Sequence, residues 1–265
     1  FPVSLIMKQI KFQTKQQLIE KIKEKKELSG LANSAVSDSL DNYLKKYKIN
    51  LKELSPKQTK IIVKEIRAEL RNLAGRFQKS LKNKSKLLKS HSEIELLKTH
   101  SSTSERLEAY PQIKELIKSL NIKSVLDLGC GLNPIALANS EIKYYASDIK
   151  EDELRLVQEF FKKHNFDGKT FVYDLRKIDN TLPKADLCLL FKVLDVIDDK
   201  KHALTRKILE KIPCKKILVS FSTKKLSGKP MNFPRRIWFE HLLKKLNFVF
   251  EKLETRNEVF YLIEK

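Results

Sequence analysis

Short apolar runs alternate with helical stretches from residue 101 to residue 265, and this alternation restricts the fold more than any other feature of the sequence. Ahead of the first apolar run, Ser102 to Glu105 fit a capping box that starts a helix ending near residue 120. Strands and helices in alternation are typical of a mostly parallel sheet covered by helices on both faces. The expected strands are 124–128, 143–147, 170–173, 186–191, 217–221 and 259–263, and the expected helices include 151–164, 202–212 and 235–246.

Residues 1–100 follow a different pattern, which is helical and basic. Thr14 is a candidate N-cap, Gly30 interrupts the first helix, and Ser55 followed by Pro56 is a strong signal for a helix start. We therefore expect an N-terminal all-helical domain over 1–100 and an α/β domain over 101–265. The expected N-terminal helices are 15–27, one from 33 or 34 to about 47, 56–77 and 80–97.

The helix expected after Pro56 has an apolar stripe and a basic stripe. Ile62 and Lys64 are two residues apart, so the stripes lie roughly 200° apart around the helix axis. One face can pack while the other contacts phosphates, although a solvated lysine face has the same pattern. The apolar stripe is Ile62, Ile66, Leu70, Leu73 and Phe77, and the basic stripe is Lys57, Lys60, Lys64, Arg67 and Arg71.

The formal net charge is +21, from 54 Lys and Arg against 33 Asp and Glu. The excess is not confined to one tail, because residues 1–105 carry 23 basic and 11 acidic side chains, and residues 106–265 carry 31 and 22. A charge this large favours a polyanionic partner, since basic side chains that neutralise phosphates release condensed counterions. A nucleic acid is the predicted partner, and a lysine-rich surface that is merely solvated is the alternative.

A cofactor site is indicated where an apolar strand runs into a glycine turn, Val125-Leu126-Asp127-Leu128-Gly129-Cys130-Gly131. Such a turn brings backbone N–H groups and a helix N-terminus close to a ligand. Asp148 ends the next strand, 19 residues after Gly129, where a carboxylate can accept both hydroxyls of a ribose. The third glycine of the dinucleotide fingerprint is missing, which favours S-adenosylmethionine over NAD.

The third strand also ends in an acidic residue. Asp174 is placed to accept from the exocyclic amine of adenine, with Leu175 against the ring. An ordinary aspartate at a strand end is the alternative.

Cysteine usage and hydropathy bear on compartment and metal binding. Cys130, Cys188 and Cys214 are widely spaced and form no CxxC pair, so neither a disulfide framework nor a zinc site is expected. No apolar run approaches the ~18 residues of a membrane span. A reducing cytoplasm without membrane attachment is the expected location.

Several segments together resemble the Arm/Rmt (FmrO-like) group of 16S rRNA guanine-N7 methyltransferases, which confer aminoglycoside resistance. The most specific segments are His100-Ser101-Ser102-Thr103-Ser104-Glu105-Arg106-Leu107 and the Gly131-Leu132-Asn133-Pro134 turn. The resemblance spans roughly residues 35–265 in consistent order. Further matching segments are 55–59, 190–194, 219–221 and 261–263.

The resemblance implies a class I S-adenosylmethionine-dependent methyltransferase fold, which is Rossmann-like, with an added helical domain that docks on the small ribosomal subunit. It also implies that Arg106 pairs with the methionyl carboxylate of S-adenosylmethionine, since arginine can grip a carboxylate bidentately. A surface arginine behind a capping box is the alternative from the sequence alone. The other cofactor contacts expected are His100, Ser101, Ser102, Gly129, Gly131, Asp148, Asp174, Leu175 and Phe191.

Residues expected near the target base follow the later strands. Lys192 ends the fourth strand, where class I enzymes place residues that face the substrate, and Ser220 and Lys229 are the other candidates for catalysis. Arg235 and Arg236 are expected to contact RNA, with Trp238 beside them. The segment 226–231 is shorter and poorer in glycine than expected for the resistance enzymes, which leaves the identity of the methylated nucleotide open.

The predicted reaction is methyl transfer to N7 of a decoding-site guanine, in helix 44 of 16S rRNA on the 30S subunit. Guanine N7 carries a free lone pair, so the enzyme needs positioning rather than a general base or a metal. We expect a monomer. The alternatives are methylation of another rRNA position such as adenine N1, a small-molecule methyltransferase, and a non-catalytic RNA-binding or ribosome-assembly factor that keeps the cofactor fold.

Overall fold

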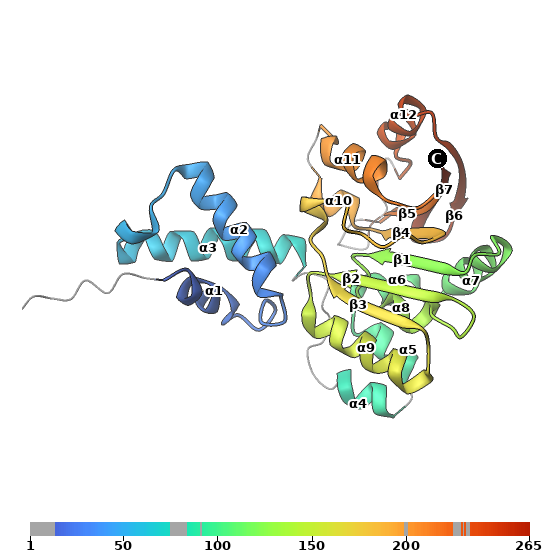
Figure 1. The fold of residues 1–265 in the computed structure, drawn as a ribbon, viewed down its shortest axis with the longest axis horizontal. Helices are drawn as coiled ribbons and strands as arrows, with labels where there is room; N and C mark the ends of the chain where they lie inside the picture. The colour runs from blue at the N-terminus through green and yellow to red at the C-terminus, as the bar shows by residue number, and fades with distance from the viewer. Residues whose placement is uncertain are drawn as a thin grey trace, which may run out of the picture.

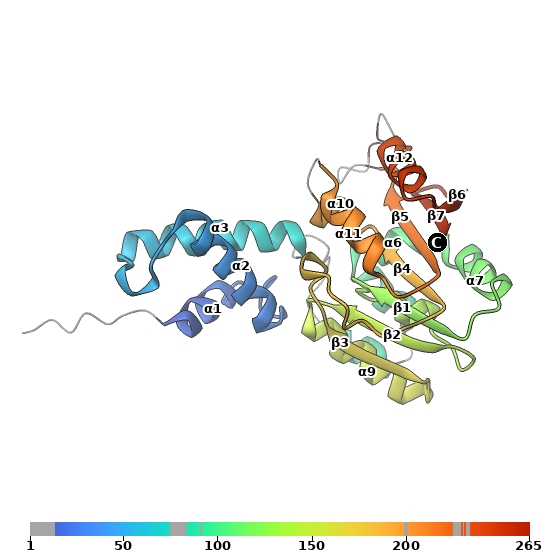
Figure 2. The same cartoon turned by 45° about the horizontal axis from the view of Figure 1, so that its top comes forward.

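The computed structural model describes residues 14–74, 84–90, 92–198, 201–224, 229, 231 and 234–265 (Figure 1). A group of three helices stands beside a seven-stranded sheet that is flanked by further helices (Figures 1 and 2). The three helices are α1 (Lys15–Lys23), α2 (Asn33–Tyr47) and α3 (Pro56–Leu73). We call them the helical part.

Local signals fix where α1 and α3 begin. The Thr14 hydroxyl accepts from the backbone N–H of Gln17, whose side chain accepts from the N–H of Thr14, and Ser55 and Gln58 repeat this capping box at α3. Helix α1 ends at Lys23, before the expected residue 27. Arg67 of α3 donates to the carbonyls of Lys21 and Ile22 in the last turn of α1. These carbonyls would accept backbone hydrogen bonds if α1 continued for another turn.

The apolar stripe of α3 builds the core of the helical part. Ile62, Ile66 and Leu70 are fully buried against apolar residues of α1 and α2, as the periodicity predicts. Leu73 is partly buried, and Phe77 lies outside the described residues.

The segment before the sheet differs from expectation. Instead of one helix over 80–97, whose start lies outside the described residues, there are α4 (Lys84–Lys89) and α5 (Glu93–Lys98). The Ser90 hydroxyl donates to the Leu87 carbonyl, a side-chain bond that competes with helix continuation. The helix expected up to residue 120 is also divided, into α6 (Ser101–Arg106) and α7 (Tyr110–Ser119), and Ser102 lies inside α6 rather than capping it.

The sheet has the strand order β3-β2-β1-β4-β5-β7-β6. Neighbours from β3 to β5 are parallel, whereas β7 runs antiparallel to both β5 and β6. This is the mostly parallel sheet that the alternating pattern predicts. The strands are β1 (Ser124–Leu128), β2 (Lys143–Asp148), β3 (Gly168–Val172), β4 (Leu187–Phe191), β5 (Lys216–Ser222), β6 (Val249–Glu254) and β7 (Glu258–Glu264).

Both faces of the sheet are buried, because successive strand residues point to opposite sides. Leu187 and Leu189 of β4 pack with α7, α8 (Asn133–Leu137) and α9 (Glu151–His164). Cys188 and Leu190 pack on the other side, with α11 (Ala203–Lys211) and α12 (Ile237–Lys245). The remaining short helix is α10 (Leu194–Ile197), after β4. None of the described helices is long and apolar enough to cross a membrane.

Strand β6 was not predicted from the sequence. It forms one edge of the sheet, and most of its side chains are exposed, Val249 to 71%. An edge strand with polar residues lacks the apolar run that reveals buried strands.

Candidate active site

A pocket opens at the carboxyl ends of β1, β2, β3 and β4. This is where open α/β sheets bind ligands. The residues that the sequence analysis assigned and that line the pocket are His100, Ser102, Gly129, Gly131, Asp148, Asp174, Leu175, Phe191 and Lys192. Ser101 and Arg106 were assigned to the cofactor as well but are not among the lining residues.

The glycine turn after β1 forms the floor of the pocket. Gly129 and Gly131 have φ angles of +69° and +49°, a region in which glycine carries no side-chain penalty. A Cβ at Gly129 would lie 3.0 Å from Val193, which is tighter than most Cβ contacts, so a side chain there would require Val193 to shift. The Gly131 N–H donates to Asp148 (2.9 Å), which ties the turn to the end of β2.

The Asp148 carboxylate is held by backbone donors. Its second oxygen accepts from the Lys150 N–H (2.9 Å), so each oxygen keeps acceptor capacity for a ligand hydroxyl. Burial, and then the nearby Glu153 charge, raise the pKa of Asp148 to about 6 despite these bonds. A carboxylate in this position is suited to bind the two hydroxyls of a ribose.

A buried charged cluster lies behind the turn. Glu153 of α9 forms an ion pair with Lys84 (2.8 Å) and lies 3.8 Å from His100 Nε2. Burial lowers the pKa of His100 to about 4, against the opposing effect of Glu153. Burial alone would raise the pKa of Glu153. The positive charges of His100, Lys84 and Lys150 outweigh the effect of burial and lower the pKa of Glu153 to about 2. At neutral pH the pocket wall therefore holds a neutral imidazole beside an ionised carboxylate.

This cluster predicts how stability depends on pH. Because the pKa of His100 falls from 6.5 to about 4 on folding, the unfolded chain takes up a proton below pH 6.5 that the folded chain refuses. The histidine therefore makes the free energy of unfolding fall as the pH falls. The variant His100→Asn lacks this group. As the pH is lowered from about 6.5 to 4.5, the free energy of unfolding of the variant is expected to rise relative to that of the wild type by up to about 1.4 kcal/mol per pH unit. Urea unfolding of both proteins measures this.

The comparison with His100→Asn is needed because other groups act in the opposite direction. Burial raises the pKa of Asp127 to about 7 and that of Asp148 to about 6, so both favour the folded state as the pH falls. These groups are present in both proteins, and their effects cancel in the difference. Parallel pH curves for wild type and variant would contradict the assignment of a neutral His100.

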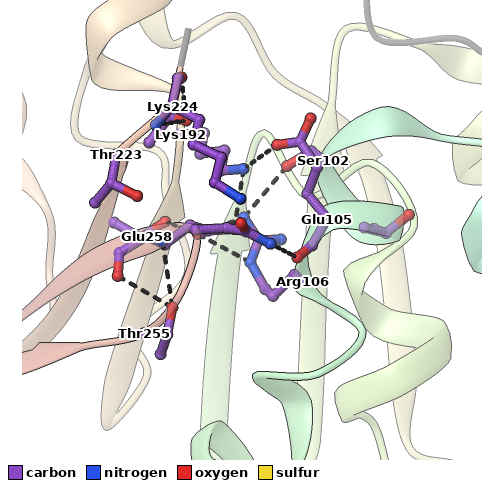
Figure 3. A network of polar contacts seen from close by, with 12 residues as sticks. Ser102, Glu105, Arg106, Lys192, Thr223, Lys224, Thr255 and Glu258 are labelled. Carbon is purple, nitrogen blue, oxygen red and sulfur yellow. Dashed lines mark hydrogen bonds and ion pairs between the residues drawn. The ribbon is translucent and has the colours of Figure 1, made fainter. Parts of the chain in front are cut away.

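Arg106 is the centre of a buried polar network (Figure 3). Its guanidinium donates to Glu258 (2.9 and 3.1 Å), to Asn133 (2.6 Å) and to Ser102 (3.2 Å). The side chains of Arg106 and Glu258 are 0% and 1% exposed. The carboxylate that Arg106 contacts in this structure is that of Glu258, and its contact with a methionyl carboxylate stays a prediction.

Ser220 belongs to the same network. It is fully buried in β5, and its hydroxyl donates to Glu258 (2.7 Å). The hydroxyl is enclosed in the core of this structure, and the expected position of Ser220 beside the target base stays a prediction. Lys229, the third residue assigned to catalysis, is exposed, and most of its segment lies outside the described residues.

Lys192 joins this network to the pocket. Its ammonium lies between Glu105 (2.7 Å) and Glu258 (3.1 Å), and its side chain is 9% exposed. The backbone of Lys192 has a φ of +57°, which is uncommon for a residue with a side chain. The chain turns at the end of β4, and Lys192 lines the pocket. Figure 3 shows its side chain close to Glu105, Arg106 and Glu258.

The opposite wall of the pocket is formed after β3. Leu175 is buried, and Asp174 accepts from Arg176 through both carboxylate oxygens, with distances of 2.7–3.1 Å. The contact with Arg176 fixes the orientation of the Asp174 carboxylate. An acceptor beside an apolar side chain is suited to bind an adenine edge.

Comparison with known proteins identifies the family. A family model described as "Ribosomal RNA methyltransferase (FmrO)" matches residues 85–262. The chain belongs to the FmrO family. A curated 16S rRNA (guanine(1405)-N(7))-methyltransferase of Serratia marcescens is 30% identical over 219 residues, which are 80% of this chain and 85% of that protein. The resemblance inferred from the sequence is confirmed, and the chain is a methyltransferase.

Solved structures agree with the fold of this FmrO-family chain. The 16S rRNA methyltransferase RmtF, in complex with S-adenosyl-L-homocysteine, superposes with a TM-score of 0.80 at 23% identity, over 95% of this chain and 98% of that one. The 16S rRNA methylase ArmA superposes with a TM-score of 0.55 at 27% identity, over 70% and 99%. The class I methyltransferase fold is confirmed.

The pocket fits the family's cofactor, S-adenosylmethionine. Gly131 lines the pocket, and a Cβ there would make a tight contact with His100 at 3.3 Å. Asp148 and Asp174 give the pocket two acceptors, and Leu175 gives it an apolar surface. Among the described residues, no group of three His, Cys, Asp or Glu side chains is arranged to hold a metal ion. Cys130, Cys188 and Cys214 are free and buried.

Some residues in the basic stripe of α3 are exposed, and others bond to groups of the protein itself. Lys57, Lys60 and Lys64 of α3 are exposed, as a contact with phosphates requires. Arg67 faces α1 instead, and Arg71 pairs with Glu27 (2.6 Å). The stripe is thus partly structural.

The two arginines before α12 also divide. Arg235 is 59% exposed and pairs with Glu240. Arg236 is 9% exposed and bonds to Asp195 (2.7 Å) and the Ser222 carbonyl. Its guanidinium thus connects α10 to β5, and the expected contact of Arg236 with RNA stays a prediction. Trp238 is half-buried and stacks on His202 at 3.6 Å between ring centroids.

Sequence reasoning missed several residues around the pocket. Glu258, Glu153 and Asn133 carry the buried network and cluster, and Lys150 lines the pocket. A charged residue opening an apolar strand was the available signal for Glu258. Lys150 follows the end of β2, where the carboxyl-end rule would have included it.

Proposed function

We propose that this protein transfers a methyl group from S-adenosylmethionine to N7 of a decoding-site guanine in 16S rRNA of the 30S subunit. The observation that carries the proposal is Lys192, a cation fixed by Glu105 and Glu258 on the wall of a pocket suited to the cofactor. The names of the curated relatives support the base and the atom.

The chain's residues divide the work along the pocket. S-adenosylmethionine supplies an electrophilic methyl group when bound. We assign Asp148 to its ribose, Asp174 and Leu175 to its adenine, and His100 and Ser102 to its amino-acid end. The neutral His100 can donate to a carboxylate without a proton being lost or gained.

Lys192 is assigned to the guanine. A lysine ammonium matches the O6 acceptor beside N7, and this contact holds the base while the N7 lone pair remains free. Guanine N7 needs no deprotonation, so alignment of the nucleophile with the methyl group accounts for most of the catalysis. The Glu105 and Glu258 partners keep the ammonium in one place before the RNA arrives.

The helical part is assigned to the ribosome. N7 lies in the deep major groove of A-form RNA, so the base must be flipped or the helix distorted, which costs a few kcal/mol. Phosphate contacts from Lys57, Lys60 and Lys64 of α3, and from the exposed Arg235 before α12, can offset this cost. We further propose that the protein is a cytoplasmic monomer, and that its methylation of the rRNA protects the ribosome from aminoglycosides.

Methyl transfer to purified 30S subunits tests the proposal. The protein is incubated with 30S subunits and S-adenosylmethionine labelled in the methyl group, and N7-methylguanine is mapped by chemical cleavage of the rRNA. Label at the decoding-site guanine is expected. Label at another nucleotide would keep the methyltransferase and remove the target, and absence of label on both 30S and naked 16S rRNA would overturn the proposal.

A further inference from the structure

Arg176 lies where the helical part meets the adenine side of the pocket. It is in the short 3-10 helix Leu175–Lys177, two residues after Asp174, whose carboxylate it grips with both Nε and Nη2. Its remaining nitrogen, Nη1, donates to Glu69 of α3 (2.7 Å) and to Ser39 of α2 (3.1 Å). One side chain therefore connects a pocket wall to two helices of the helical part.

The side chains of Ser39, Glu69 and Arg176 form a triangle in which each one is hydrogen-bonded to the other two. The Ser39 hydroxyl is fully buried and donates to the same Glu69 oxygen (3.0 Å) that accepts from Arg176. The orientation of the Arg176 guanidinium is thus fixed by the helices and not by the pocket alone. A guanidinium is a planar fork, so fixing one edge also fixes the edge that faces Asp174.

Other contacts place the helical part against the cofactor loops. The Ala32 N–H donates to the Ile149 carbonyl (2.9 Å), and Leu31 forms a β-bridge with Lys150. Ile149 and Lys150 follow Asp148 and line the pocket. Figures 1 and 2 both show α3 running toward this side of the sheet, and Leu73 at its end lines the pocket as well.

We propose that Arg176 is a positioning residue through which the helical part sets the adenine end of the cofactor site. Ser39 of α2 and Glu69 of α3 fix the orientation of Arg176, and Arg176 fixes the Asp174 carboxylate. This carboxylate then accepts a hydrogen bond from the adenine amine. The inference rests on the proposed Asp174–adenine contact but not on the identity of the methylated base. Coupling between two sites is reciprocal, so any change in cofactor affinity that RNA causes by fixing the helical part is matched by an equal change in RNA affinity caused by the cofactor.

The test is titration calorimetry of S-adenosyl-L-homocysteine with the full chain. Glu69→Gln removes the ion pair between α3 and Arg176 but leaves the Arg176–Asp174 pair in place. It is expected to weaken binding by about five- to tenfold, at the low end of measured couplings. The matched control is Glu210→Gln, which breaks an exposed pair with Arg206 on α11 and is expected to leave affinity unchanged.

A second ligand separates positioning from general damage. The analogue of S-adenosyl-L-homocysteine whose base is unsubstituted purine carries a hydrogen atom where adenine carries its amine, so it has no N–H donor for Asp174. Glu69→Gln is expected to leave the affinity for this analogue unchanged and so to reduce the preference for the adenosyl ligand. Equal weakening of both ligands would overturn the inference.

Two further variants keep the result interpretable. Ser39→Ala is expected to reproduce the effect of Glu69→Gln in part. Asp174→Asn is expected to weaken the adenosyl ligand most; if it does not, the adenine contact and the inference both fail. If Asp174→Asn weakens binding and neither Glu69→Gln nor Ser39→Ala does, the contact stands and the inference is overturned. No arm uses RNA, so an incorrect rRNA target leaves these outcomes unaffected.

Discussion

Replacing Arg106 by methionine is expected to lower the free energy of unfolding by roughly 3–5 kcal/mol, the usual cost of removing one partner from a buried ion pair. Among the residues that the structure describes, the variant leaves the Glu258 carboxylate with Ser220 and Lys192 as its side-chain partners. Urea denaturation followed by circular dichroism measures the loss.

The double variant Arg106→Met/Glu258→Gln decides whether the pair is the cause. Removing both charges avoids an uncompensated carboxylate, so the double variant is expected to recover much of the stability that Arg106→Met loses. Losses that simply add would show that Arg106 and Glu258 contribute separately, contrary to the geometry of the network.

Lys192→Ala is expected to slow methyl transfer to 30S subunits by about 100-fold, the size of effect that follows when a reacting group is misplaced. Its affinity for S-adenosyl-L-homocysteine is expected to change by less than about threefold, since the ammonium pairs with two protein carboxylates and we assign it to the guanine. Single-turnover kinetics and calorimetry measure the two quantities.

The alanine variant is a clean comparison because both residues carry a Cβ, so the strain of the φ of +57° is unchanged. Lys211→Ala, at the end of α11, is the matched control and is expected to leave both quantities as in wild type. Equal loss of methyl transfer and cofactor affinity would remove the substrate role of Lys192.

The sheet could be predicted from the sequence because its signals are local. An apolar run reveals a buried strand, and β1 (Ser124–Leu128) and α9 (Glu151–His164) begin and end at the expected residues. The cofactor side follows from the same logic, since Gly129 and Asp148 stand at strand ends. The edge strand β6, exposed on most positions, gave no such signal.

The polar network could not be predicted, because its partners are distant in the sequence. Arg106 and Glu258 are 152 positions apart, and nothing in either local sequence indicates the other. The same limit applies to the partners of Arg67 and Arg236. The sequence places both among basic residues expected at the surface, but Arg67 donates to backbone carbonyls of α1 and Arg236 pairs with the Asp195 carboxylate. A stripe of charge predicts a helix face and does not show which of its members turn inward.

The place of β7 has a consequence for how a nascent chain becomes an enzyme. The helical part draws its core from residues 18–74, so it can fold early, whereas β7 inserts between β5 and β6 and brings Glu258 to Arg106. Until that strand arrives, the interior around α6 holds an uncompensated cation, and Lys192 lacks one of its two carboxylates. During synthesis the surface that we assign to docking is therefore complete long before the chain can transfer a methyl group.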